Sequence, residues 1–86
     1  MLPLLQVITR QQCSLCDDAY IAADLAQRNG LCQLEVVDVD KDSSLLEKYG
    51  HDVPVLLING QEYVRHFVEY PKLALALRAA QEDSHE

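Results

Sequence analysis

The sequence contains no tryptophan, one phenylalanine and one methionine, and only three residues each of glycine, proline and cysteine. It is also short of basic residues, with seven lysines and arginines against fourteen aspartates and glutamates, a formal charge of −7. That balance, without a basic patch, opposes binding to nucleic acid or to an anionic membrane. Because 49% of the 86 residues are hydrophobic, intrinsic disorder is excluded and one packed core is expected.

Long hydrophobic runs are absent as well, and no targeting segment is expected. The first eight residues are apolar, but they lack a basic region and a small-residue cleavage site, and about 20 residues are needed to span a bilayer. An odd number of cysteines, two of them three positions apart, is not typical of a secreted disulfide scaffold. We therefore expect a cytoplasmic monomer with a single domain over residues 1–86, of which residues 82–86 form a frayed tail.

Hydrophobic periodicity predicts an α/β chain in the order β-α-β-α-β-β-α. The expected strands cover residues 4–9, 32–39, 55–58 and 61–64, and the expected helices cover residues 17–28, 43–49 and 71–80. The first and third strands are continuous apolar runs, so we place them at the centre of the sheet, with the half-polar strands outside. The first strand-helix-strand unit predicts a parallel pair with a right-handed crossover.

Turn and cap residues support these boundaries. Asn29-Gly30 is a stop signal for the first long helix, in which Ala19, Tyr20, Ala23 and Ala26 form the expected inner face. Asp42 or Ser43 is the expected cap of the short helix, and Gly50 its expected end. Asn59-Gly60 predicts a two-residue hairpin, and Pro71 opens the last helix, whose inner face is expected at Leu73, Ala76, Leu77 and Ala80.

The chemistry of the chain centres on Cys13-Ser14-Leu15-Cys16, where the first strand gives way to a helix. A thiolate attacks a disulfide, and unpaired amides and the dipole at a helix start lower a cysteine pKa to roughly 3.5 to 7.5. Cys13 lies at that position, while Cys16, one turn further, is expected to be less exposed and placed to resolve a mixed disulfide. The spacing thus predicts an asymmetric redox site.

Nearby charged residues have opposing effects on the stability of a thiolate at this site. Arg10 can favour a thiolate at Cys13, whereas Asp17 and Asp18 oppose it if they point towards the sulfurs. Both aspartates also suit the first turn of a helix, where a carboxylate stabilises the positive end of the dipole.

Two other interpretations of the cysteine pair stay open. One is a metal or iron–sulfur site, in which Cys32, His51, His66 or His85 would supply further ligands. The other is a redox-silent binding module that docks a partner through the loop at Pro54 and the surface at Arg65-His66. Cys32 by itself is expected to be a small buried hydrophobic residue.

Together these residues resemble the glutaredoxin branch of the thioredoxin-like fold, over nearly the whole chain. The resemblance depends on the Cys-x-x-Cys after the first strand, on Asp52-Val53-Pro54 before the third, and on the Asn59-Gly60 hairpin. More narrowly, Cys-x-x-Cys-Asp-x-Ala followed by Tyr-Gly-x-x-Val-Pro-Val-Leu is similar to a family of small bacterial glutaredoxin-like proteins. The resemblance implies a four-stranded mixed sheet with helices on both faces.

The resemblance also implies a function, that of a dithiol–disulfide oxidoreductase. Cys13 would be the nucleophile and Cys16 the resolving thiol, acting on protein disulfides or glutathione mixed disulfides. No tightly bound cofactor is implied, glutathione is a candidate co-substrate, and the partner is a disulfide-containing protein or glutathione. The reductant is not implied by the resemblance.

Substrate-binding residues follow from the same resemblance. Pro54 would be a cis-proline facing the dithiol, and the backbone of Val53 would pair with an extended substrate. Arg10 matches a basic residue that contacts the glutathione carboxylate, and Ser14 and Leu15, between the cysteines, complete the predicted set.

The sequence departs from the glutaredoxin pattern at two places in the expected glutathione site. Asp52 stands where Thr-Val-Pro has threonine, and residues 63–70 replace the Gly-Gly and Asp segment that binds the γ-glutamyl end. Within that stretch, Arg65 or His66 is a candidate for recognising an acidic partner.

Overall fold

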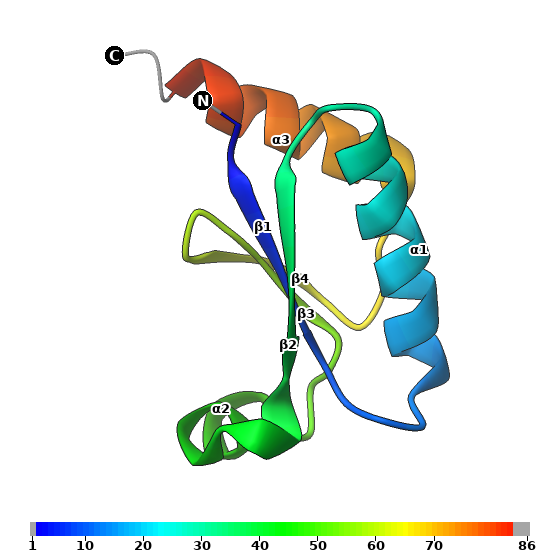
Figure 1. Ribbon diagram of the computed structural model, residues 1–86, viewed down its shortest axis with the longest axis vertical. Coiled ribbons are helices and arrows are strands. Elements are labelled where there is room, and N and C mark those ends of the chain that lie inside the picture. The colour runs from blue at the N-terminus through cyan, green and yellow to red at the C-terminus, as the bar shows by residue number, and fades with distance from the viewer. Residues whose placement is uncertain (1, 84–86) are drawn as a thin grey trace.

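The computed structural model describes residues 2–83 and contains the predicted order of elements, with one added 3-10 turn (Figure 1). In chain order they are β1 (Leu4–Thr9), α1 (Ser14–Arg28), β2 (Gln33–Asp38), η1 (Val39–Lys41), α2 (Ser43–Tyr49), β3 (Val55–Ile58), β4 (Gln61–Arg65) and α3 (Tyr70–Asp83). Within residues 2–83, no helix has the length and apolar character required to cross a membrane.

The four strands form one mixed sheet in the order β2-β1-β3-β4. β1 and β2 are parallel, whereas β3 is antiparallel to both β1 and β4. The predicted placement of the strands is confirmed, because the two continuous apolar runs, β1 and β3, occupy the centre. A central strand is covered on both faces and therefore has apolar residues at both parities.

Helices cover both faces of the sheet, as predicted, and alternate residues of the central strands divide between two cores. Leu5, Val7 and Leu56 lie in the larger core with α1 and α3. Ile8 and Val55 point the other way and pack with residues of η1 and α2. In Figure 1, α1 runs down the right of the sheet, α3 runs across the top of the view, and α2 lies at the lower end. Successive side chains of a strand point to opposite faces, so β1 joins the two cores.

The inner face of α1 follows the prediction only in part. Tyr20 is 44% exposed, and the buried positions are instead Cys16, Ala19, Ala22, Ala23 and Ala26. These positions recur at steps of three and four residues, and the alanines carry side chains small enough for the helix to lie close to the sheet. The helix also begins at Ser14 rather than residue 17, because Cys13 caps it.

The last helix also follows its pattern only in part. Leu73 and Leu77 are fully buried as predicted, but Ala74 is buried while Ala76 and Ala80 are half-buried. The helix continues to Asp83, and the rest of the predicted tail lies outside the described residues.

The boundaries of α2 show which of the predicted caps is used and why Gly50 is needed. The Asp42 carboxylate accepts hydrogen bonds from the backbone N–H groups of Ser44 and Leu45, so Asp42 is the cap. Gly50 has a helical φ of −56°, not the left-handed conformation that a glycine stop predicts. A Cβ at this position would clash with the Leu46 carbonyl oxygen. Glycine is therefore needed here because no side chain fits, and not because of its backbone conformation.

The predicted Asn59-Gly60 hairpin is present between β3 and β4. Both residues have positive φ, 52° for Asn59 and 84° for Gly60, as a two-residue turn of this type requires. Asn59 also connects the turn to β1, because its side-chain oxygen accepts from the Leu4 N–H at 2.9 Å.

Gly60→Ala is expected to lower the free energy of unfolding by about 1–2 kcal/mol, because a Cβ is unfavourable in the left-handed region. Space is not the cause, since nothing lies within 4 Å of a Cβ built at Gly60. Urea unfolding measures the difference. Gly60→Asn is the matched control and should lose less unfolding free energy, because asparagine tolerates this backbone conformation. Equal losses in the two variants would contradict the explanation.

Candidate active site

Cys13 lies at the start of α1 as its N-terminal cap. Its backbone is extended, with φ −123° and ψ 107°, and its sulfur accepts a hydrogen bond from the Cys16 N–H at 3.2 Å. The Cys13 carbonyl oxygen in turn accepts from the Asp17 N–H at 3.2 Å. A sulfur therefore takes the place of the usual cap oxygen, where amide N–H groups and the helix dipole stabilise negative charge.

The two cysteines form a disulfide in this structure, and their environments differ as predicted. Cys13 and Cys16 have Cα atoms 5.2 Å apart, within the range that a disulfide requires. Cys13 is half-buried, whereas Cys16 is only 4% exposed. A substrate thus has access to the first sulfur and not to the second.

The residues around the disulfide are surface residues. Ser14 is exposed and Leu15 is half-buried, so both are accessible to a substrate docked over the disulfide. Asp17 and Asp18 are exposed as well, and Asp17 lies in the first turn of α1, where its charge stabilises the helix end. The roles of Ser14 and Leu15 in substrate binding stay predictions.

The Val53–Pro54 peptide bond is cis, as the family resemblance implied. The register of the sheet pairs Ile8 with Val55, so Pro54 lies beside the end of β1, from which the chain continues to Cys13. Pro54 is fully buried, while Val53 is half-buried. The fold therefore brings the proline loop and the dithiol to the same end of the sheet, although about 40 residues separate them in sequence.

Arg10 contacts other parts of the protein. Its Nε lies 3.2 Å from a carboxylate oxygen of Asp40, and its Nη1 donates to the Gly50 carbonyl oxygen at 3.2 Å. The guanidinium thus connects the segment before Cys13 to η1 and to the end of α2. Contact with a substrate carboxylate stays a prediction for Arg10.

A charged cluster beside the proline loop was not found by sequence reasoning. Arg65 donates to Asp52 at 2.6 Å and to both carboxylate oxygens of Glu62 at 2.7 and 2.8 Å. Its guanidinium also lies 5.5 Å from the centre of the Tyr49 ring, and His66 Nε2 lies 3.7 Å from Asp52. Two carboxylates therefore share the Arg65 guanidinium, and recognition of an acidic partner by Arg65 or His66 stays a prediction.

The pKa values of this cluster follow from its contacts. The hydrogen bond to Arg65 lowers the pKa of Glu62, and its partner carboxylates, Glu62 first and then Asp52, raise the pKa of Arg65. Glu62 and Arg65 are three apart, a spacing that puts residues of a regular strand on opposite faces. The register shift opposite Leu56 and Leu57 adds one residue to β4, so the two side chains meet.

Among the described residues, those proposed as further metal ligands, Cys32, His51 and His66, do not form a metal-binding group with the dithiol. Cys32 is 2% exposed within the larger core, where burial raises its pKa, as expected for a small hydrophobic residue. In the part of the chain that the structure describes, no three Cys, His, Asp or Glu side chains form a metal-binding group. His85 lies outside those residues.

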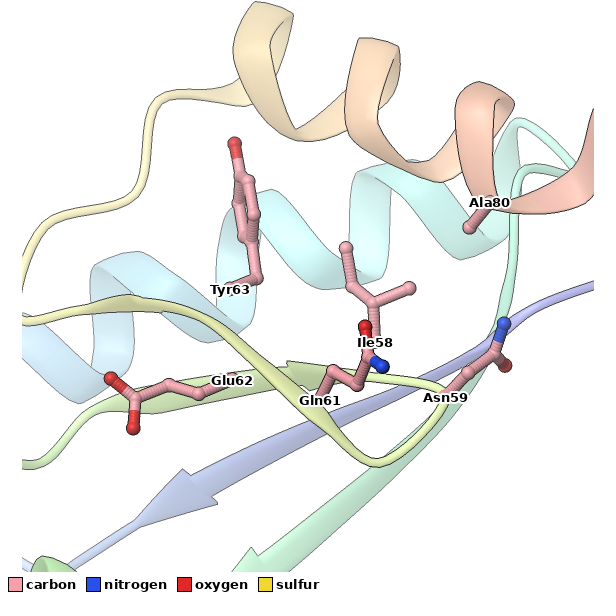
Figure 2. Close-up of a pocket in the computed structure, with 6 residues that line it drawn as sticks. All are labelled: Ile58, Asn59, Gln61, Glu62, Tyr63 and Ala80. Atoms are coloured by element: carbon pink, nitrogen blue, oxygen red, sulfur yellow. The ribbon is translucent and has the colours of Figure 1, made fainter. Parts of the chain in front are cut away.

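Two surface hollows lie between β4 and α3, at a distance from the predicted site. The larger, of about 390 Å³, is shown in Figure 2 and is lined by Ile58, Asn59, Gln61, Glu62, Tyr63 and Ala80. The smaller, of about 240 Å³, is lined by Tyr63, Val64, Phe67, Glu69 and Lys72. Neither includes a predicted site residue, and the larger lies at the hairpin end of the sheet, opposite the end that carries the dithiol.

Known proteins match this chain both in sequence and in fold. A family model described as "Glutaredoxin-like domain (DUF836)" matches residues 4–78. The crystal structure of protein XcR50 from X. campestris is 31% identical, with 87% of this chain and 96% of that chain covered and a TM-score of 0.71.

Two further solved structures are similar. Protein Ne2328 from Nitrosomonas europaea is 24% identical, with 88% of this chain and 92% of that chain covered and a TM-score of 0.73. Thioredoxin 1 from Thermosipho africanus is 19% identical, with 96% and 99% covered and a TM-score of 0.68. At these identities the likeness shows the fold alone, which is thioredoxin-like.

Proposed function

The chain belongs to the glutaredoxin-like domain family, and from that premise we propose that it is a thiol–disulfide oxidoreductase. The observation that carries the proposal is the position of Cys13, whose sulfur caps α1 and is bonded to the buried Cys16. A capping sulfur at a helix start is the arrangement that favours a thiolate, the form that attacks disulfides. The proposed substrates are protein disulfides or glutathione mixed disulfides.

The proposed reaction has two exchange steps. The Cys13 thiolate attacks one sulfur of the substrate disulfide, forming a mixed disulfide, and the other substrate sulfur leaves as a thiolate that takes up a proton. Cys16 then loses its proton and attacks the Cys13 sulfur, which releases the second substrate thiol. Two electrons have passed from the dithiol to the substrate, and the Cys13–Cys16 disulfide remains for a thiol reductant, with glutathione a candidate, to reduce.

The burial of Cys16 supports these different roles, with Cys13 as the attacking thiol and Cys16 as the resolving thiol. A buried thiol is protected from direct attack by substrate, but its neighbour in the first turn of α1 is within bonding distance, as the disulfide demonstrates. Reaction at Cys13 followed by resolution at Cys16 is therefore the order that accessibility favours.

Contacts around the site favour an extended protein segment over free glutathione as the substrate. Arg10 is paired with Asp40, and the cluster beside Val53, in which Asp52 and Glu62 share the single Arg65 guanidinium, carries more negative than positive charge. Glutathione carries a net negative charge, whereas a protein segment can pair through its backbone with Val53. The cytoplasm is the proposed compartment, because its thiol pools keep such a dithiol reduced.

The alkylation rate of Cys13 as a function of pH tests the proposal. In the reduced protein, the rate is expected to reach half its maximum well below about pH 8.5, the value of an ordinary cysteine, because only the thiolate reacts. Mass spectrometry of the alkylated peptides separates Cys13 from the buried Cys32, which serves as the unreactive internal control. A midpoint near that of an ordinary thiol would contradict the proposal and favour the redox-silent binding module.

A further inference from the structure

The loop that carries the cis-proline is held to β4 by contacts from two consecutive residues. The Arg65 guanidinium donates to Asp52 at 2.6 Å, and the His66 N–H donates to the Pro54 carbonyl oxygen at 2.8 Å. Val53 lies between these two anchored residues. The Asp52 N–H in turn donates to the Tyr49 carbonyl oxygen at 2.8 Å, which ties the start of the loop to the end of α2.

Other contacts orient the guanidinium of Arg65. Glu62 accepts two hydrogen bonds from it, at Nε and at the second terminal nitrogen, and the buried Tyr49 ring lies 5.5 Å from its carbon. Bidentate pairing with one carboxylate sets the plane of the guanidinium, so the remaining terminal nitrogen points to Asp52. The Asp52–Arg65 contact is thus one part of a network with a defined geometry.

The backbone of His66 has an unusual conformation at the second contact. His66 has φ 69°, a left-handed value that is uncommon for a residue other than glycine, and the Phe67 N–H donates to the Arg65 carbonyl oxygen at 2.8 Å. The chain therefore turns tightly around His66 at the end of β4. Conformations of this kind persist where the surrounding contacts enforce them, and they are frequent at functional sites.

We propose that Arg65 is a positioning residue for substrate binding, acting through Asp52 to hold the Val53 backbone where an extended disulfide-containing peptide pairs with it. This proposal rests on the proposed function and adds to it a residue, outside the dithiol and the proline loop, that sets the position of the peptide-binding backbone. Arg65 does not touch the reacting sulfurs. It acts on the geometry of the loop, and small displacements of a substrate-positioning group reduce reaction rates substantially.

The test measures the formation of the mixed disulfide in a Cys16→Ser background, where the second exchange step cannot follow. The probe is an extended peptide with one cysteine linked by a disulfide to thionitrobenzoate. Attack by Cys13 forms the Cys13–peptide disulfide and releases the coloured thiolate, so absorbance gives both a limiting rate and a half-saturating concentration. The comparison substrate is the parent reagent, the symmetric disulfide of two thionitrobenzoates, which contains no peptide.

Asp52→Asn and Glu62→Gln are a matched pair, since each removes the charge from one carboxylate bonded to Arg65, and only Asp52 precedes Val53. We expect Asp52→Asn and Arg65→Met to raise the half-saturating peptide concentration about fivefold to tenfold, a factor of ten corresponding to about 1.4 kcal/mol. The limiting rate should stay within about twofold, and Arg65→Lys should recover part of the loss. Glu62→Gln keeps an amide oxygen that can accept from the guanidinium and leaves the Asp52 carboxylate in place, so it is expected to weaken peptide binding less than Asp52→Asn does.

Each result decides between distinct conclusions. If Glu62→Gln weakens peptide binding as much as Asp52→Asn, or if Arg65→Met binds the peptide normally, the positioning role is wrong. A double variant, Asp52→Asn with Arg65→Met, that is no worse than the weaker-binding single variant would support action through the pair. If the parent protein reacts with neither disulfide, the proposed function itself fails, whereas reaction with both and no dependence on Arg65 refutes only this inference.

Discussion

Cys13→Ser is expected to abolish disulfide reduction, lowering the rate by at least about a thousandfold. A serine hydroxyl does not ionise near neutral pH, so neither the helix dipole nor the Cys16 amide that contacts the sulfur can produce a nucleophile. Substitution at Cys13 changes one atom on a half-buried side chain, so the fold should persist. Reduction of a protein disulfide by the purified variant, with a thiol reductant present, measures the loss.

Two companion variants make the result specific to the dithiol. Cys16→Ser should accumulate a mixed disulfide at Cys13, visible as added mass, because the resolving thiol is gone. Cys32→Ala, which changes the third cysteine in the core, should keep the activity. Full activity of the Cys13 variant would overturn the assignment of Cys13 as the nucleophile.

Leu77→Ala is expected to lower the free energy of unfolding by about 2–5 kcal/mol. Leu77 is fully buried in the larger core, where α3 packs against the sheet and α1, so truncation loses hydrophobic burial and leaves a cavity. A domain of this size has about 5–15 kcal/mol of stability in total, and the loss is a large part of it. Urea unfolding followed by circular dichroism measures the change.

Leu75→Ala is the matched control in the same helix. Leu75 is 66% exposed, two residues from Leu77, and its truncation should change stability by about 0.5 kcal/mol or less. Both substitutions replace leucine by alanine in the same helix and so change the helix propensity equally. The difference between their losses of unfolding free energy therefore reports the effect of burial alone. Similar losses at the two positions would contradict the assigned inner face of α3.

Much of the fold followed from local patterns. The continuous apolar runs of β1 and β3 indicated central strands, and Asn59-Gly60 indicated the hairpin between β3 and β4, as the sheet order and positive φ values confirm. Such features are short-range, since each depends on the preferences of a few adjacent residues. Tyr20 was misplaced because a helix with many small apolar residues has more than one candidate inner face, and contact with the sheet selects among them.

The part of the candidate site that was predictable is the cysteine pair, because its chemistry depends on the spacing of two nearby residues. Cys13 and Cys16 are three residues apart at a strand–helix junction, so their unequal exposure follows from one turn of helix. Pro54 was placed through the family resemblance, because its cis peptide bond has no local signal strong enough to predict it.

By itself, the sequence determined the order of the elements, the centre of the sheet and the asymmetric dithiol, because each depends on neighbours within a few residues. Tertiary structure alone decided how Arg10 is paired and how Asp52 meets Arg65 across a loop and a bulged strand. These contacts join residues 13 to 30 positions apart, and a partner at that distance depends on strand register and on a one-residue shift in β4.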